Sequence, residues 1–390
     1  MKILQVISSF PPAYSYGGPV KVSYDISKEL VKNNHEVTVY TTDVYNSHSR
    51  LNYKTNPEMI DGIIVYRFRN LSNFLSKKNF SFAPMMYFFL KSHIKEFDII
   101  HLHEYRSVQA IFVSHLARKS NIPYIIQAHG SVLPTFEKQW LKKIFDIFWG
   151  KKILFEASKC IALTKKEAEY YQIMGVPKKN IVIIPNGVHI EEYKELPNLG
   201  NFRMRYDFQK DTKLILYIGR IHQSKGLDLL IDAFNELIQE RINCKLIMIG
   251  PDDGYLQQIE RKINNFRLHE KIIIIGFIPI NEKIEALVDS DVFVTPSFSG
   301  FPITFLEACA CGLPVITSTH GDSLDWIDNN VGFVVEYNLS RLKEAILKII
   351  DDEAVSKKFS NQGKRLVAEQ FNWNAICDQI EMNYREVIYQ

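Results

Sequence analysis

Short apolar runs alternate with amphipathic helical patterns along almost the whole chain, and this alternation constrains the fold more than any other feature. One series begins at the N-terminus and a second begins at Leu214. Such runs are typical of strands buried on both faces, and the helices between them favour parallel sheets covered on both sides. The expected strands are 2–7, 37–41, 63–68, 98–103, 124–129, 161–164 and 181–185, then 214–219, 245–250, 272–275, 292–295, 315–317 and 333–335.

Chain length and the two series together predict two domains. With 390 residues the chain is long for a single hydrophobic core. The polar stretch from Glu191 to Lys213 has no strong apolar period, so it is the best candidate for the connection. We therefore predict an α/β fold of two Rossmann-like domains, 1–190 and 191–371, that face each other across a cleft, followed by a final helix over 372–390.

Composition excludes several classes of protein. A net charge of +3 over the whole chain gives no basis for nucleic-acid binding. The five cysteines are an odd number in mostly apolar surroundings, which indicates buried, reduced thiols. There is no signal-peptide pattern, and no apolar run approaches the ~18–20 residues that a spanning helix needs. We expect a cytoplasmic protein that can still sit on a membrane surface.

Two loops follow strands at places where open α/β sheets bind ligands. The loop from Ser8 to Gly18 leads into a helix with Pro19 near its start, and a helix N-terminus suits anions. It lacks G-x-G-x-x-G, so a dinucleotide fingerprint is not supported. The loop that begins at Pro296 leads into a helix carrying Glu307 among small and apolar residues. A carboxylate there suits a vicinal diol such as a ribose, although it could equally be a solvated helix residue.

Other polar residues at strand ends have a functional and a structural interpretation. Arg220 and Lys225 follow the first strand of the second series, and they could clamp a diphosphate or simply be solvated loop charges. His129 ends a strand, where it could act on a ligand or be a structural residue that is hydrogen-bonded within the fold. His101 and His103 share one face of a strand, but no third clustered ligand is evident, so we predict no metal.

Two segments interleave aromatic and basic residues, namely Phe74 to Phe97 and Trp140 to Phe155. Basic amphipathic helices of this kind can lie on anionic membrane surfaces. They can equally be core helices whose lysines reach out to solvent. Because both segments are embedded in the βα alternation, packing is the favoured interpretation.

Taken together, the motifs resemble those of the retaining glycosyltransferases of family 4, which have the GT-B fold. The resemblance covers nearly the whole chain, with the stretches in the family's order, and Phe371-Asn372-Trp373 fits the segment where members cross back to the first domain. The other matching stretches are Gly17-Gly18-Pro19, residues 35–42, 98–103, His129-Gly130, 184–188, Gly219-Arg220 with Lys225-Gly226, and Pro296-Ser297 with Glu307-Ala308.

The resemblance implies a role for each matching residue. His129 would lie beside the donor sugar, while Arg220 and Lys225 would neutralise the leaving diphosphate, which removes the need for a divalent metal or another cofactor. Glu307 would hold the ribose. The implied donor-binding residues are Gly17, Gly18, Asn186, Gly219, Gly276, Phe277, Ser299, Gly300, Phe301, Pro302, Ile303, Thr304 and Glu307, with backbone amides of 301–304 contacting the sugar or diphosphate.

The chain departs from the family pattern at three places. Ser299 stands where the family usually has a glutamate, so no negative charge is supplied beside a developing oxocarbenium. His189 replaces the usual aspartate after Asn-Gly-Val, and residues 321–325 replace a Gly-Gly…Glu loop. These changes bear on the donor more than on the fold.

The implied reaction is retaining transfer of a sugar from a UDP- or GDP-linked donor to a hydroxyl acceptor. The departing phosphate would deprotonate the acceptor, which we expect to be a lipid-linked or surface glycan in polysaccharide assembly at the inner face of the cell membrane. Two alternatives remain. One is a nucleotide-sugar epimerase on the same fold, and the other is a nucleotide-sugar-binding protein that lost catalysis because Ser299 replaces the family's usual glutamate.

Overall fold

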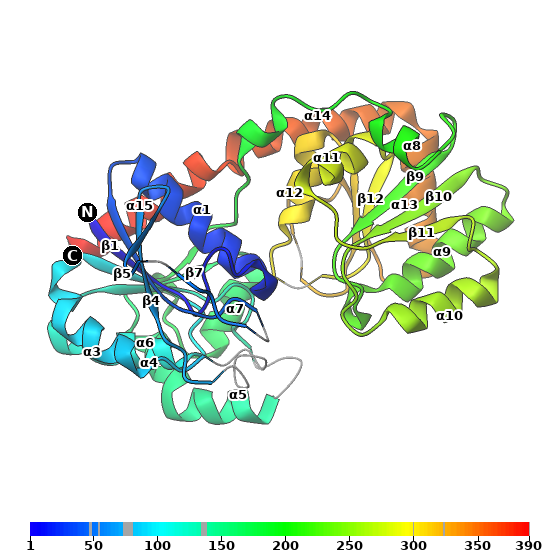
Figure 1. Ribbon diagram of the computed structural model, residues 1–390. Helices are drawn as coiled ribbons and strands as arrows, with labels where there is room; N and C mark the ends of the chain where they lie inside the picture. The colour runs from blue at the N-terminus through cyan, green and yellow to red at the C-terminus, as the bar shows by residue number, and fades with distance from the viewer. Residues whose placement is uncertain are drawn as a thin grey trace. The chain divides into compact units, whose positions relative to one another are not determined.

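A computed structural model describes residues 1–46, 49–53, 55–72, 81–133, 139–298, 300–322 and 324–389. It divides the chain into two compact units (Figure 1). Unit 1 comprises Met1–Asn186 together with Trp373–Gln390, and unit 2 comprises Gly187–Asn372. Each unit contains one largely parallel sheet with helices on both faces, so the prediction of two parallel-sheet α/β domains is confirmed.

The sheet of unit 1 has the order β3-β4-β2-β1-β5-β6-β7-β8. All neighbours are parallel except β3, which runs antiparallel to β4 at the sheet edge and was not predicted, because three residues are too few to show a period. The strands are β1 (Lys2–Val6), β2 (Glu36–Thr42), β3 (Glu58–Ile60), β4 (Ile63–Phe68), β5 (Ile99–His103), β6 (Tyr124–Gln127), β7 (Lys159–Ala162) and β8 (Ile181–Ile183).

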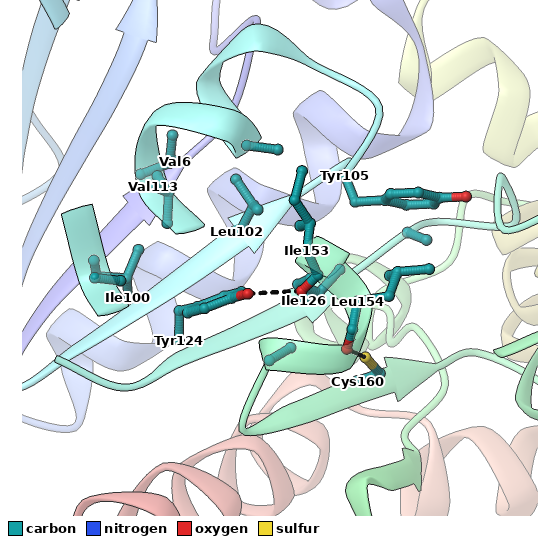
Figure 2. Packing of buried hydrophobic residues seen from close by; sticks show 14 of the residues in the cluster. Val6, Ile100, Leu102, Tyr105, Val113, Tyr124, Ile126, Ile153, Leu154 and Cys160 are labelled. Atoms are coloured by element: carbon teal, nitrogen blue, oxygen red, sulfur yellow. Dashed lines mark hydrogen bonds between the residues drawn. The ribbon is translucent and has the colours of Figure 1, made fainter. Parts of the chain in front are cut away.

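Helices cover both faces of this sheet. One face carries the apolar core built from α3, α4, α6 and the facing side chains of β1, β5 and β6, and Figure 2 shows part of it. The Tyr124 hydroxyl donates to the Ile153 carbonyl at 2.6 Å, so even this buried phenol is satisfied. The helices are α1 (Gly18–Lys32), α3 (Pro84–His93), α4 (Val108–Ser120), α5 (Gln139–Phe145), α6 (Lys151–Glu156), α7 (Lys165–Ile173) and α15 (Trp373–Ile388), with a π-helical turn, η3 (Asp146–Gly150), between α5 and α6.

The sheet of unit 2 is entirely parallel, with the order β11-β10-β9-β12-β13-β14. Its strands are β9 (Lys213–Ile218), β10 (Cys244–Ile249), β11 (Ile272–Ile275), β12 (Val292–Thr295), β13 (Val315–Ser318) and β14 (Gly332–Val335). Its helices are α8 (Asn201–Arg205), α9 (Leu227–Gln239), α10 (Leu256–Phe266), α11 (Ile280–Asp289), α12 (Ile303–Cys311), α13 (Leu339–Asp351) and α14 (Glu353–Gln370). Leu227, Leu230, Ile231 and Phe234 turn the apolar face of α9 into the core.

The polar stretch 191–213 is not the linker that its composition suggested. It lies wholly inside unit 2, where the buried Asp289 carboxylate accepts hydrogen bonds from the backbone N–H groups of Gly200, Phe202 and Arg203 at 2.6–3.0 Å. The Arg203 guanidinium in turn donates to the Asp289 carbonyl and to Asp291. The Asp289 carboxylate therefore binds this segment to the domain, together with the buried side chains of Tyr193, Phe202 and Phe208.

Replacing Asp289 with alanine should destabilise unit 2 by about 2–3 kcal/mol, because one buried and two partly buried backbone donors lose a charged acceptor. Urea unfolding of the full chain would measure this loss. Asp289→Asn, which keeps one carbonyl acceptor, should lose less. Equal stability of the alanine variant and the parent would contradict the assignment.

Candidate functional site

The predicted donor-binding loops of unit 2 lie at the point where its strand order reverses. From β9 the chain proceeds outward through β10 to β11, then returns to the other side of β9 as β12. Loops after β9 and β12 therefore lie on either side of this switch point at the carboxyl ends of the strands, the usual ligand position in open α/β sheets. The two loops meet, since a Cβ added to Gly226 would lie 3.0 Å from the Pro296 side chain.

The loop after β9 brings two cations to this edge. The Arg220 side chain is 62% exposed and is paired with Asp253, which is also exposed. Lys225 ends a short turn, and burial, with a smaller contribution from Arg220, lowers the pKa of its ammonium. A partly desolvated lysine beside an arginine is an arrangement that an incoming polyanion would stabilise.

Glu307 is buried in α12 and is held by two partners that sequence inspection missed. Lys283 of α11 donates to its carboxylate at 2.7 Å. The Tyr193 hydroxyl lies near the same carboxylate, and its pKa is raised mainly by burial and further by Glu307. The carboxylate has enough acceptor sites to bind a diol as well. Nothing in the sequence indicated these partners, because they lie on separate elements.

The loop before α12 departs from the predicted use of its backbone amides. Gly300 already donates its N–H to the Asp322 carboxylate. Pro302 has no N–H, so the expectation that every amide from 301 to 304 serves the ligand is wrong at that position. The Phe301 side chain is buried between Trp326 and Phe371. Ile303 and Thr304, at the first turn of α12, remain as donors, and Ser299 lies outside the described residues.

Other predicted donor residues occupy open positions at strand ends. Gly219 follows β9 and accepts no larger side chain, since an added Cβ would lie 2.6 Å from the Tyr217 hydroxyl. Gly276 and Phe277 follow β11, and the Phe277 ring is 87% exposed, available for stacking on a flat ligand.

The remaining predicted residues belong to unit 1. Gly17 has φ 90°, a conformation that favours glycine, and with Gly18 it starts α1 without any side chain in front of the helix N-terminus. Asn186 follows β8, and its buried Oδ1 has no hydrogen-bond partner within the described residues. His129 lies just after β6 in a left-handed conformation, φ 52°.

His129 is one end of a row of polar side chains within unit 1. Its Nε2 lies 2.9 Å from His103 Nδ1, and His103 Nε2 lies 2.7 Å from Gln5 Oε1. Gln5 Nε2 reaches the Tyr384 hydroxyl of α15, which lies 2.6 Å from His101 Nδ1. The three imidazoles are also stacked in sequence. His101 and His103, for which no metal was predicted, are members of this hydrogen-bonded row.

Burial and the row together fix the charge and tautomer of His129. Burial lowers the pKa of His101 and His129 to about 3, and burial with the neighbouring imidazoles lowers the pKa of His103 as well. Because His103 Nε2–H donates to the Gln5 oxygen, its Nδ1 must accept from His129 Nε2–H. His129 is therefore neutral and keeps an unprotonated Nδ1, suited to orienting a hydroxyl and not to carrying positive charge.

Among the described residues, no three histidine, cysteine, aspartate or glutamate side chains are placed to hold a metal ion. None of the described helices has the length and apolar character to cross a bilayer.

Comparisons with known proteins agree with this architecture. A family profile described as Glycosyltransferase Family 4 matches residues 16–192, and one described as Glycosyl transferases group 1 matches residues 201–366. An uncharacterized glycosyltransferase of Methanocaldococcus jannaschii is 26% identical over 99% of this chain and 98% of its own length. The UDP-Gal:alpha-D-GlcNAc-diphosphoundecaprenol alpha-1,3-galactosyltransferase of Escherichia coli is 24% identical over 75% of this chain and 76% of its own.

A solved structure shows the same fold. Anabaena HepE, determined in complex with UDP and glucose, superposes with a TM-score of 0.76, covers 99% of this chain and 100% of its own, and is 18% identical. The two profiles adjoin one another along the chain and fall on units 1 and 2, whose strand-end loops carry the expected motifs. The chain belongs to the family-4 glycosyltransferases and has the GT-B fold.

Proposed function

We propose that this chain transfers a sugar, with retention of anomeric configuration, from a UDP- or GDP-linked donor to a hydroxyl of a lipid-linked or surface glycan. The observation that carries the proposal is the placement of Arg220, Lys225 and Glu307 around one switch point of a parallel sheet. The HepE structure with UDP and glucose, and the nucleotide and lipid-diphosphate named for the E. coli relative, support this choice of donor and acceptor.

The residues suggest how the reaction is promoted. Negative charge grows on the diphosphate as the sugar leaves, and cations already in place stabilise that charge without reorganisation. Lys225 would contribute most, since it is the less hydrated of the two, while Arg220 must first give up Asp253. Neutral His129 would hold a sugar hydroxyl through Nδ1, and the departing phosphate would take the acceptor's proton.

Incubation with donor alone tests the proposal. The wild-type chain should be thermally stabilised by UDP or GDP, and it should release that nucleotide from the matching sugar donor slowly with water and quickly with an acceptor extract. Appearance of a second nucleotide sugar without acceptor would instead identify an epimerase. Nucleotide binding without turnover in any extract would identify a binding protein.

Transfer should survive chelation, because Arg220 and Lys225 supply the positive charge that a divalent ion would otherwise provide. Rates measured with and without excess EDTA, after dialysis against the chelator, should agree within error. A complete loss that is restored by Mg²⁺ or Mn²⁺ would contradict this part of the mechanism.

The chain also presents an apolar–basic surface, formed by residues 140–155 of α5, η3 and α6. Although packing was the favoured interpretation of this segment, large apolar side chains are exposed here, with Ile147 and Phe148 at 71% and 66%. Exposed lysines lie among them. The exposed apolar side chains are Trp140, Leu141, Ile144, Ile147, Phe148, Trp149 and Phe155.

The charge of this surface is complementary to an anionic bilayer. Asp146 is the acid within the segment, and it is buried and paired with Arg106 at 2.7 Å, so it does not oppose the lysines. Aromatic and aliphatic side chains ringed by Lys143, Lys151 and Lys152 match the interfacial position between headgroups and acyl chains. We include in the proposal that the chain binds the inner face of the cell membrane through this surface, where a lipid-linked acceptor would be found.

Liposome sedimentation tests membrane contact. The wild-type chain should bind vesicles containing phosphatidylglycerol, bind phosphatidylcholine vesicles less, and lose affinity as salt rises. The double variant Ile147→Ser/Phe148→Ser should bind these vesicles at least roughly tenfold less tightly, because it removes two large apolar groups. Ile173→Ser, an equally exposed apolar residue of unit 1 outside the surface, should bind normally. Equal binding by all three proteins would refute the proposal, and association in the absence of lipid would indicate a protein partner.

A further inference from the structure

Unit 1 contains a polar pocket at its own topological switch point. β1 lies between β2 and β5, so the chain leaves β1 in one direction and returns on the other side at β5. The pocket has a volume of about 280 Å³, and its walls come from the loops after both strands and from the first turn of α1. Its lining combines apolar atoms with hydroxyl groups, and the hydroxyl groups belong to Ser8, Ser9, Tyr16, Ser81 and Ser131.

Among the described residues of this lining, Glu104 is the one that carries a carboxylate. It follows β5 directly and has φ 67°, an uncommon conformation for a residue other than glycine. Its backbone is fixed there by a hydrogen bond from its N–H to the Gln127 carbonyl. Within the described residues its carboxylate has no hydrogen-bond or ion-pair partner, and burial raises its pKa to about 7. A half-buried carboxylate that lines a pocket without a partner is costly for the fold, which suggests that a ligand completes it.

The other charges at the pocket favour a neutral ligand over an anion. Arg106 is already bound to both Asp146 oxygens and to the Ser131 and Val132 carbonyls. Lys142 also has an interaction partner. With these cations engaged, Glu104 would repel a phosphate, while it can accept hydrogen bonds from uncharged hydroxyls.

The second observation is the Tyr16 hydroxyl, which is buried and has no partner within the described residues. A phenol can both donate and accept, so it can bind either end of a sugar hydroxyl. The pocket volume lies near the lower limit for small-molecule sites, roughly 300–1,000 Å³. It therefore suits one sugar ring and not an extended oligosaccharide.

We propose that this pocket holds one sugar ring of the acceptor glycan and that the Glu104 carboxylate accepts a hydrogen bond from one of its hydroxyls. The proposal rests on the glycosyltransferase function above and deepens it, because it gives the acceptor's chemical class as an uncharged glycoside. Glu104 is then a specificity-determining residue, since an acceptor ring that carries an acidic group would be rejected by its charge.

Saturation-transfer NMR with single-ring probes tests the pocket directly. The probes are octyl β-glucoside, octyl β-galactoside and octyl N-acetyl-β-glucosaminide, each below its micelle concentration, at pH 8 so that Glu104 is ionised. Wild-type protein should bind at least one of them, and Glu104→Gln should bind it roughly tenfold less tightly. Glu169→Gln, which changes an exposed carboxylate of α7 elsewhere in unit 1, should bind like wild type.

The outcomes separate this inference from the proposed function. Thermal stabilisation by UDP or GDP measures the donor half alone, and it should be the same in Glu104→Gln as in wild type, which also establishes that the variant is folded. If nucleotide binds but the glycosides bind the variant as tightly as wild type, the Glu104 assignment is overturned and the transferase proposal stands. Failure of the wild-type protein to bind any of the three glycosides also overturns the Glu104 assignment. Failure to bind any nucleotide overturns the proposed function instead.

Discussion

Lys225→Ala should lower the rate of sugar transfer by about 10²–10³-fold, the loss expected when one preorganised group that stabilises transition-state charge is removed. Affinity for the nucleoside diphosphate should also fall, by about 1–3 kcal/mol, because the released diphosphate carries the negative charge that Lys225 would neutralise. Steady-state kinetics and calorimetry with UDP and GDP measure the two effects. Both effects follow from the partly desolvated position of Lys225, whose pKa burial lowers.

Arg220 and Asp253 provide the matched comparison. Arg220→Ala should also weaken nucleotide binding, by about 1–3 kcal/mol. Asp253→Asn should leave affinity unchanged or raise it, since it frees Arg220 from its present partner. Lys210→Ala, an exposed lysine of unit 2, should have no effect on either quantity. Unchanged nucleotide affinity in both Lys225→Ala and Arg220→Ala would reject the diphosphate clamp.

Acidification from pH 8 to pH 5 should destabilise unit 1 by roughly 4 kcal/mol, well before ordinary carboxylates titrate. His101, His103 and His129 stay neutral in the folded state because their pKa values are lowered, to about 3 for His101 and His129. In the unfolded chain they bind protons below about pH 6.5. The stability that these residues contribute is therefore present above that pH and is lost as the pH falls, by about 2 kcal/mol each at pH 5.

Glu104 changes the stability of unit 1 with pH in the opposite direction, so its contribution is included in the net loss. Its folded pKa of about 7 lies above the unfolded value, so its contribution to stability is present at low pH and is lost as the pH rises through 7. On acidification, the stability gained at Glu104 offsets about the loss that one histidine causes, which leaves the net loss of roughly 4 kcal/mol given above. Arg106, Lys142 and Tyr16 are the other ionisable groups in the described lining of its pocket.

Hydrogen exchange of peptides from β5 and β6, followed with pH, measures this stability. His129→Leu should reduce the number of protons taken up on unfolding by one, whatever its absolute stability, and His269→Gln, an exposed histidine of unit 2, should not change it. Glu104→Gln should steepen the acid dependence. A stability that is flat between pH 8 and pH 5 would contradict the neutral histidine row.

The fold was predictable from sequence because its signals are local. One of the amphipathic helical patterns of the second series is α9 (Leu227–Gln239), whose apolar face follows Gly226, where a φ of 70° ends the preceding turn. The strands follow apolar runs to within a few residues. The linker prediction failed at 191–213 because that segment is fixed by Asp289, and such a cap leaves no trace in periodicity.

The candidate site was only half predictable, for the same reason. Strand ends indicated His129, Arg220 and Glu307, but their partners depend on which strands and helices become neighbours. Parallel pairing of β5 with β6 sets His103 opposite Gln127, two residues before His129. Lys283 meets Glu307 because α11 packs on α12. Neither register nor helix packing can be read from the spacing of apolar residues.

The row behind His129 also has a consequence for biosynthesis. Its member Tyr384 is buried and belongs to the last helix of the chain, while its partners Gln5 and His101 are made far earlier. During synthesis on the ribosome, unit 1 therefore lacks this buried side chain until all of unit 2 has been synthesised. An N-terminal fragment ending at Asn186 would lack that phenol permanently, so the two halves of this enzyme are not separable at the boundary that the fold presents.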